Sequence, residues 1–92
     1  YCRDNDIKFW IGSMVETGVS KMLHVQLAAL ADTYMAGDLS DSKRYFEDDL
    51  MVQDITFTDG QMTVPKGPGL GVEVRPDVLS RYAVETVVIE TL

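Results

Sequence analysis

The chain has 92 residues, a length that supports one small hydrophobic core and not two. Its composition, 46% hydrophobic and 25% charged, is that of a soluble globular protein, and no apolar run approaches the roughly 20 residues of a membrane span. The net charge of −7 excludes nucleic acid and anionic membranes as partners, because both bind through clustered lysine and arginine.

The first part of the chain predicts a strand, a helix and a second strand. Residues 7–11 form a short β-prone run that stops at a glycine and a serine. Apolar residues then recur at helical spacing, with Thr17 or Ser20 as candidate caps: Val19, Met22, Leu23, Leu27 and Leu30. Residues 33–36 read as another strand. This order predicts an α/β protein with a parallel sheet, and one such unit needs further strands beside it.

The second part of the chain has a different character. Residues 39–54 are polar and predict part helix and part loop, in which the adjacent acids Glu47, Asp48 and Asp49 read as a solvated surface rather than a cation site. Asp59-Gly60 joins two alternating runs and predicts a hairpin. Residues 65–71 are rich in proline and glycine and therefore predict an irregular turn. They are not read as a phosphate-binding loop, because they lack its Gly-Lys-Ser/Thr ending.

Three short elements are expected to close the chain. Residues 72–74 predict a strand, Pro76 suits the first position of a helix, and residues 84–89 are again β-prone. We therefore divide the chain into residues 1–54, which carry the parallel unit, and residues 55–92, which carry the hairpin, a helix and terminal strands.

The segment between the first strand and the helix is the strongest candidate for a functional site. It joins the carboxyl end of a parallel strand to a helix start, the position that faces the active site in α/β barrels. Its glycines allow backbone amides to approach a ligand, and Glu16 could accept a hydrogen bond there. Asp38 occupies the equivalent place after the second strand. A competing interpretation is that Glu16 only complements the helix dipole.

Four ordered motifs give the chain a family resemblance: residues 10–19, 36–40, 44–49 and 64–72. In order and spacing they resemble the o-succinylbenzoate synthase and N-acylamino-acid racemase group of the enolase superfamily. Two differences are visible, because Met22-Leu23-His24 replaces a common Ala-His-Asn and Ala36 replaces a common proline. The resemblance implies a modified (β/α)7β barrel, of which residues 7–11 are the seventh strand and residues 33–36 the eighth. The C-terminal hairpin and strands would then belong to an α+β capping domain.

The chemistry that the resemblance implies is proton abstraction next to a carboxylate, through an enediolate stabilised by Mg²⁺. Loss of water gives the synthase reaction of menaquinone biosynthesis, and reprotonation gives racemisation. The resemblance implies that the catalytic lysines and the Mg²⁺ ligands lie outside this segment, so no catalytic or metal residue is assigned here. The implied substrate-binding residues are Gly12, Ser13, Met14, Glu16 and Asp38.

The chain is accordingly expected to be the C-terminal segment of a longer cytoplasmic enzyme, inactive by itself. Its start, which lacks an initiator methionine, and its single cysteine, which fits a reducing compartment, agree with this expectation. The expected partners are the remainder of the parent chain, a small carboxylate substrate and further copies in a homo-oligomer. The alternative is a free-standing acidic α/β module that binds a partner without catalysis.

Overall fold

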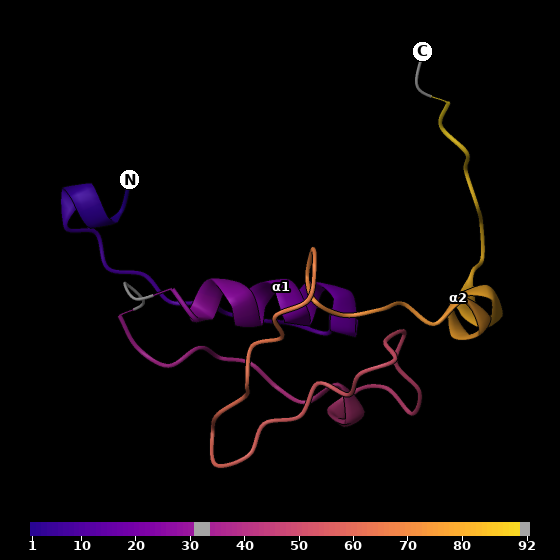
Figure 1. Cartoon of the computed structure of the whole chain (residues 1–92), viewed down its shortest axis with the longest axis horizontal. Coiled ribbons are helices and arrows are strands. Elements are labelled where there is room, and N and C mark those ends of the chain that lie inside the picture. The colour runs from indigo at the N-terminus through magenta and orange to yellow at the C-terminus, as the bar shows by residue number, and fades with distance from the viewer. Residues whose placement is uncertain (31–33, 91–92) are drawn as a thin grey trace.

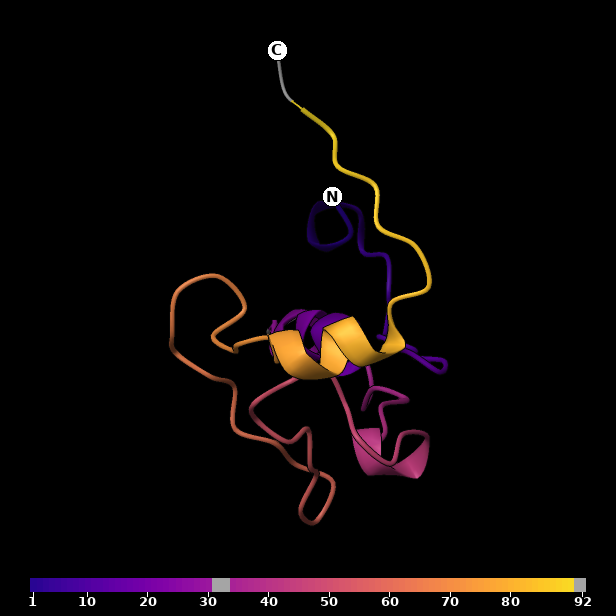
Figure 2. The ribbon, with the colours of Figure 1, turned by 90° about the vertical axis from the view of Figure 1, so that its right-hand side faces the viewer.

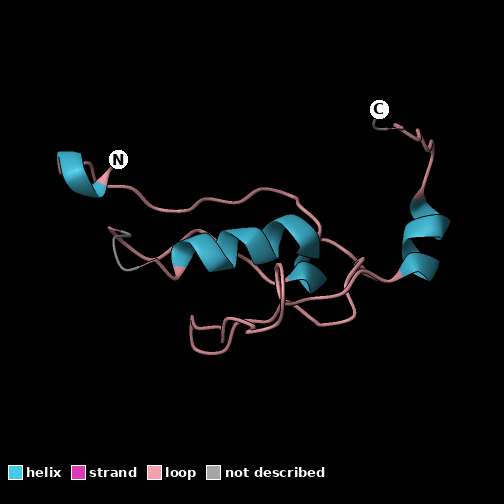
Figure 3. Cartoon of the chain, turned by 45° about the horizontal axis from the view of Figure 1, so that its top comes forward, coloured by secondary structure: helices cyan, strands magenta, loops and turns pink. Residues whose placement is uncertain are grey.

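The computed structural model describes residues 1–30 and 34–90, which are organised around one central helix (Figure 1). A short 3-10 helix, η1 (Arg3–Asn5), precedes the central helix α1 (Gly18–Ala28), and η2 (Ser42–Arg44) and α2 (Pro76–Tyr82) follow it. Among the described residues, strand pairing is limited to isolated bridges, so Figure 3 shows helices joined by long loops.

Helix α1 forms where helical spacing predicted it, and one of its faces packs against the rest of the chain. Its buried residues, Gly18, Lys21, Met22 and Val25, stand at positions i, i+3, i+4 and i+7 and therefore share one face. Of the predicted apolar stripe only Met22 is fully buried, whereas Leu23, Leu27 and Leu30 are 46%, 39% and 53% exposed. The prediction of a helix is confirmed, and among these periodic apolar residues only Met22 belongs to the buried face of the helix.

Two segments that flank α1 in sequence lie side by side and run parallel. Gly12 and Asp38 form a parallel bridge, the Asp38 amide donates to the Ile11 carbonyl at 2.9 Å, and the Tyr34 amide donates to the Phe9 carbonyl at 2.7 Å. The predicted order of extended segment, helix and parallel extended segment is therefore present. Residue 33 of the expected second strand lies outside the described residues.

These two segments are not regular strands, contrary to the prediction for residues 7–11 and for the described part of residues 33–36. A strand gains its stability from hydrogen-bonded neighbours and from packing on its faces, and a single pair with one covering helix provides little of either. The pairing is consequently reduced to isolated bridges between extended segments.

The predicted hairpin turn is confirmed at Asp59-Gly60. Both residues have positive φ, 50° and 72°, as a type I′ turn requires, and Thr58 and Gln61 exchange two backbone hydrogen bonds of 2.9 Å. Residues 65–71 also form the predicted turn, in which the Gly71 amide donates to the Pro68 carbonyl. Gly71 has a φ of 73°, and a side chain there would collide with Pro65, so this position suits only glycine.

The last third of the chain agrees with the prediction in its helix and differs in its strands. Helix α2 begins at Pro76 as expected. The strand predicted over residues 72–74 is a single antiparallel bridge from Val74 to Met51. The strand predicted over residues 84–89 is absent: these residues are exposed, and they extend away from the body of the molecule (Figure 2). An extended segment without a neighbour has no partner for its backbone groups and forms no ladder.

The hydrophobic core is small and lies on the inner face of α1. Met22, Val25 and Ile55 are its buried centre, and partly buried residues of the second half surround them: Leu39, Phe57, Met62, Val64, Leu70 and Val72. The radius of gyration is 15.4 Å, whereas a compact chain of this length is expected near ~12 Å. The fold is thus an open arrangement in which the second half of the chain wraps one side of α1.

Candidate functional site

The predicted site residues lie at the carboxyl ends of the two parallel segments. The bridge places Gly12 directly beside Asp38, and Ser13, Met14 and Glu16 follow Gly12 in the loop that leads to α1. The structure therefore brings Gly12 and Asp38 together and places the other three in one adjoining loop. Met14 is 75% exposed, so its side chain is available for contacts beyond this chain.

The loop of residues 13–17, called here the Glu16 loop, is closed by its own carboxylate. Both oxygens of Glu16 lie 2.7 Å from the Met14 amide nitrogen, which donates to them. Short side-chain bonds of this kind to a backbone amide two residues away stabilise tight turns. Glu16 thus accepts a hydrogen bond, as the sequence analysis suggested, but the donor is the backbone of its own loop.

The start of α1 is held by a residue distant in sequence. The Gly18 amide donates to Oδ1 of Asp49 at 3.0 Å, and the same oxygen accepts the Leu50 amide at 2.7 Å. Thr17 occupies the N-cap position that the sequence suggested, yet its side chain makes no capping hydrogen bond. Asp49 therefore satisfies one of the amides that every helix start leaves free.

The neighbouring Asp48 anchors α2. It lies 2.5 Å from Nη1 of Arg75 and 3.3 Å from Nη1 of Arg81. The hydrogen bond to Asp48 raises the pKa of Arg75 from its ordinary value, and the charge of Asp48 adds to this effect. The prediction that Glu47, Asp48 and Asp49 form a solvated surface is therefore wrong for two of the three acids, and holds only for the exposed Glu47.

The contacts of Asp48 and Asp49 could not be predicted from neighbouring residues in the sequence. The Gly18–Asp49 bond joins residues 31 positions apart, and the Arg81–Asp48 bond joins residues 33 positions apart. The buried Lys21 was missed for the same reason: its ammonium donates to the Asp41 carbonyl at 3.1 Å and lies 4.8 Å from the centre of the Tyr45 ring. Only tertiary structure brings these groups together.

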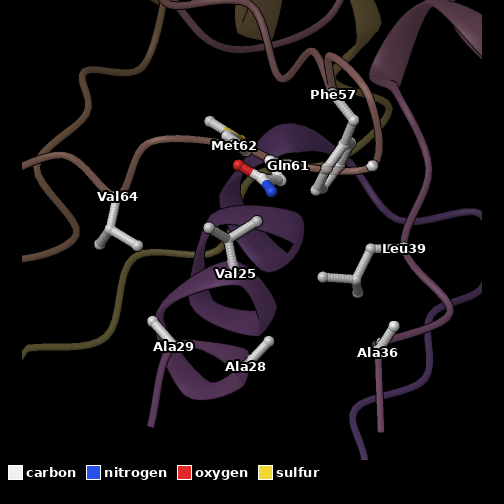
Figure 4. Close-up of a pocket in the computed structure, with 11 residues that line it drawn as sticks. Val25, Ala28, Ala29, Ala36, Leu39, Phe57, Gln61, Met62 and Val64 are labelled. Carbon is white, nitrogen blue, oxygen red and sulfur yellow. The ribbon is translucent and has the colours of Figure 1, made fainter. Parts of the chain in front are cut away.

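Two hollows occur near these elements, and none of the five predicted site residues lines either one. The first, of about 470 Å³, lies between the end of α1 and the hairpin. Figure 4 shows Val25 and Ala28 of α1, with Ala29 just after the helix, on one side of it and Leu39, Phe57 and Met62 on the other. The second, of about 500 Å³, lies between residues 47–49, called here the acidic turn, and α2, and Thr17 also lines it.

The described residues supply no metal centre: among them, no three His, Cys, Asp or Glu side chains come together in a way that would hold an ion. The described helices are also all too short or too polar to cross a membrane.

Comparison with known proteins finds relatives that match most of this chain. The chain is 41% identical over 81 residues to o-succinylbenzoate synthase of Bacillus subtilis (strain 168), covering 88% of this chain and 22% of that protein. It is 37% identical over 78 residues to N-succinylamino acid racemase of an Amycolatopsis species, covering 85% of this chain and 21% of that protein.

Solved structures give the same result. An enolase superfamily member from Enterococcus faecalis V583 is 37% identical with a TM-score of 0.79, covering 88% of this chain and 22% of that one. Another, from Listeria innocua Clip11262, is 35% identical with a TM-score of 0.80, covering 89% and 22%. The chain thus spans about a fifth of the length of these relatives. The model of the enolase C-terminal domain-like family matches residues 1–78, and the chain belongs to that family.

Proposed function

We propose that this chain is the C-terminal segment of a Mg²⁺-dependent o-succinylbenzoate synthase, with N-acylamino-acid racemisation as a second activity of the same site. Relatives that carry these two names match 88% and 85% of this chain, which supports both activities. In this proposal residues 7–11 and 33–36 are the last two strands of a barrel, and the hairpin and residues 84–89 belong to a capping domain.

One observation carries the site proposal: the parallel bridge between Gly12 and Asp38. In a parallel barrel, neighbouring strands present their carboxyl ends on the same face, and active sites form there. Gly12, Ser13, Met14, Glu16 and Asp38 are accordingly proposed to line the substrate pocket. Their role is to shape it and to orient a small carboxylate substrate, while the catalytic proton transfers are assigned to residues of the parent enzyme outside this chain.

In the proposed pocket, Glu16 holds the loop and its neighbours Met14 and Val15 face outward. Because the Glu16 carboxylate is bonded to the Met14 amide, it keeps the loop in one conformation and leaves the Met14 and Val15 side chains 75% and 62% exposed. These two side chains would offer an apolar surface to the substrate. Mg²⁺ is proposed as the cofactor of the parent enzyme; the described residues supply no ligand cluster for it, and its ligands are assigned to the remainder of the parent.

The test uses two preparations in parallel. The complete enzyme that contains this chain should convert the hydroxy-acid precursor of o-succinylbenzoate when Mg²⁺ is present, and the isolated 92-residue chain should not. A hybrid in which this chain replaces the matching segment of the Bacillus subtilis synthase should also retain synthase activity. A folded, magnesium-loaded complete enzyme without synthase or racemase activity would refute the proposed function, and turnover by the isolated chain would refute the assignment of catalysis to other segments.

A further inference from the structure

The contact between Asp49 and Gly18 has a geometry that constrains the Glu16 loop. One carboxylate oxygen of Asp49 receives two backbone amides, from Gly18 at 3.0 Å and from Leu50 at 2.7 Å. The other oxygen, Oδ2, is buried and has no hydrogen-bond partner among the described residues. The carboxylate lies at the start of an 11-residue helix, where the helix dipole favours negative charge.

Gly18 is shaped to this contact. A Cβ placed on Gly18 would lie 2.6 Å from Oδ2 of Asp49 and would also collide with the side chain of Met51. Gly18 is buried within this contact, as is Met51. The absence of a side chain at Gly18 therefore lets residues 49–51 approach the helix start closely enough for the hydrogen bond to form.

The Glu16 loop ends at this contact. Glu16 bonds back to the Met14 amide, so that residues 14–16 are held as one closed turn. Thr17 follows, and its side chain gives no capping hydrogen bond that would hold the helix start locally. Any displacement of Gly18 is transmitted to the closed turn, because a single residue separates it from Glu16.

We propose that Asp49 is a positioning residue, which fixes the Glu16 loop against the acidic turn and thereby sets how well the loop accepts substrate. The inference rests on the proposed function, in which this loop lines the substrate pocket. Asp49 acts through the Gly18 amide and not on the substrate. Its neighbour Asp48 provides the matched control, because its two arginine contacts attach α2 rather than the loop.

The experiment compares Asp49→Ala, Asp49→Asn and Asp48→Ala in the complete enzyme that contains this chain. Asp49→Ala removes the acceptor, and we expect KM to rise roughly fivefold to tenfold, the effect of one lost hydrogen bond, with a much smaller change in kcat. Asp49→Asn retains an oxygen that can accept the Gly18 amide, and its KM should return to within about twofold of the unmodified enzyme. Asp48→Ala should lower the thermal midpoint and leave KM unchanged.

Hydrogen exchange of residues 13–18 provides a readout that does not depend on turnover. The Gly18 amide should be protected in the unmodified enzyme, and exchange across the loop should accelerate in Asp49→Ala and stay the same in Asp48→Ala. If both alanine variants change only the thermal midpoint, the positioning role is overturned. If the unmodified enzyme has neither activity, the proposed function fails, and exchange alone decides whether Asp49 holds the loop. If Asp49→Ala does not fold, an unprotected Gly18 amide in the unmodified enzyme overturns the inference.

Discussion

Gly12 and Asp38 face each other across a parallel backbone bridge, although the whole of α1 separates them in sequence. The bridge is the structural link between the two segments that sequence analysis marked as site-forming. It places the loop that begins at Gly12 and the residues that follow Asp38 at the same end of the pair.

A first prediction concerns the close approach at the start of α1. Gly18→Ala places a methyl group against Asp49 and Met51, and we expect it to lower the free energy of unfolding of the complete enzyme by about 1–3 kcal/mol, as overpacking does. Gly12→Ala is the matched control, because a Cβ there meets no atom within 4 Å. Urea denaturation of both variants checks the prediction; equal stability of the two would contradict it.

A second prediction concerns the buried Lys21, which is only 2% exposed. Lys21→Met keeps the aliphatic stem but removes the hydrogen bond to the Asp41 carbonyl and the charge beside the Tyr45 ring. We expect a loss of about 1–3 kcal/mol of stability, since the carbonyl is left without this donor. The exposed Lys43→Met should change stability much less than Lys21→Met does. A double-mutant cycle with Tyr45→Leu measures the ring contact, and a coupling energy of zero would show that the ring contributes nothing.

A third prediction concerns alkaline pH. The hydrogen bond to Asp54, at 2.5 Å, and then its charge raise the pKa of Lys43 above 10.5. A pKa raised by folding means that the contribution of this pair to stability is fully present below pH 10.5 and is lost as the pH rises through the folded-state pKa. The effect on stability should be small because both side chains are exposed. Titration of the Lys43 side chain by NMR should show the raised pKa, and Asp54→Asn should lower that pKa toward its ordinary value.

A fourth prediction concerns the isolated chain in solution. Large apolar side chains are exposed along the extended segments, on the outer face of α1 and on the C-terminal residues 84–89, called here the tail; they include Trp10, Met14, Leu23, Tyr34, Val84, Val88 and Ile89. We expect the isolated 92 residues to self-associate at micromolar concentration, because such surfaces and unpaired extended segments associate readily.

Sedimentation velocity and thermal unfolding of the isolated chain check this expectation. A cooperative unfolding transition in a monomer would contradict it and would favour the alternative of a free-standing binding module. Substituting Val84, Val88 and Ile89 with serine separates the tail from the other surfaces, since association that persists in this variant arises elsewhere.

Much of the local structure was predictable because it depends on neighbouring residues. Asp59-Gly60 forms the expected turn, since both residues tolerate positive φ. Pro76 opens α2, since its ring suits the first turn of a helix. The family was also evident from motif order, and the comparisons confirm it. The assignment of Gly12, Ser13, Met14, Glu16 and Asp38 to a substrate site stays a prediction.

The sequence by itself thus determined the two α-helices, the tight turns and the family, because short-range spacing, backbone preferences and motif order encode them. Tertiary structure alone decided which face of α1 is buried and which acids have partners. Asp48 and Asp49 are adjacent and chemically identical, yet one anchors α2 and the other holds the start of α1. Their roles depend on donors about thirty positions away, and no local pattern records the positions of such distant groups.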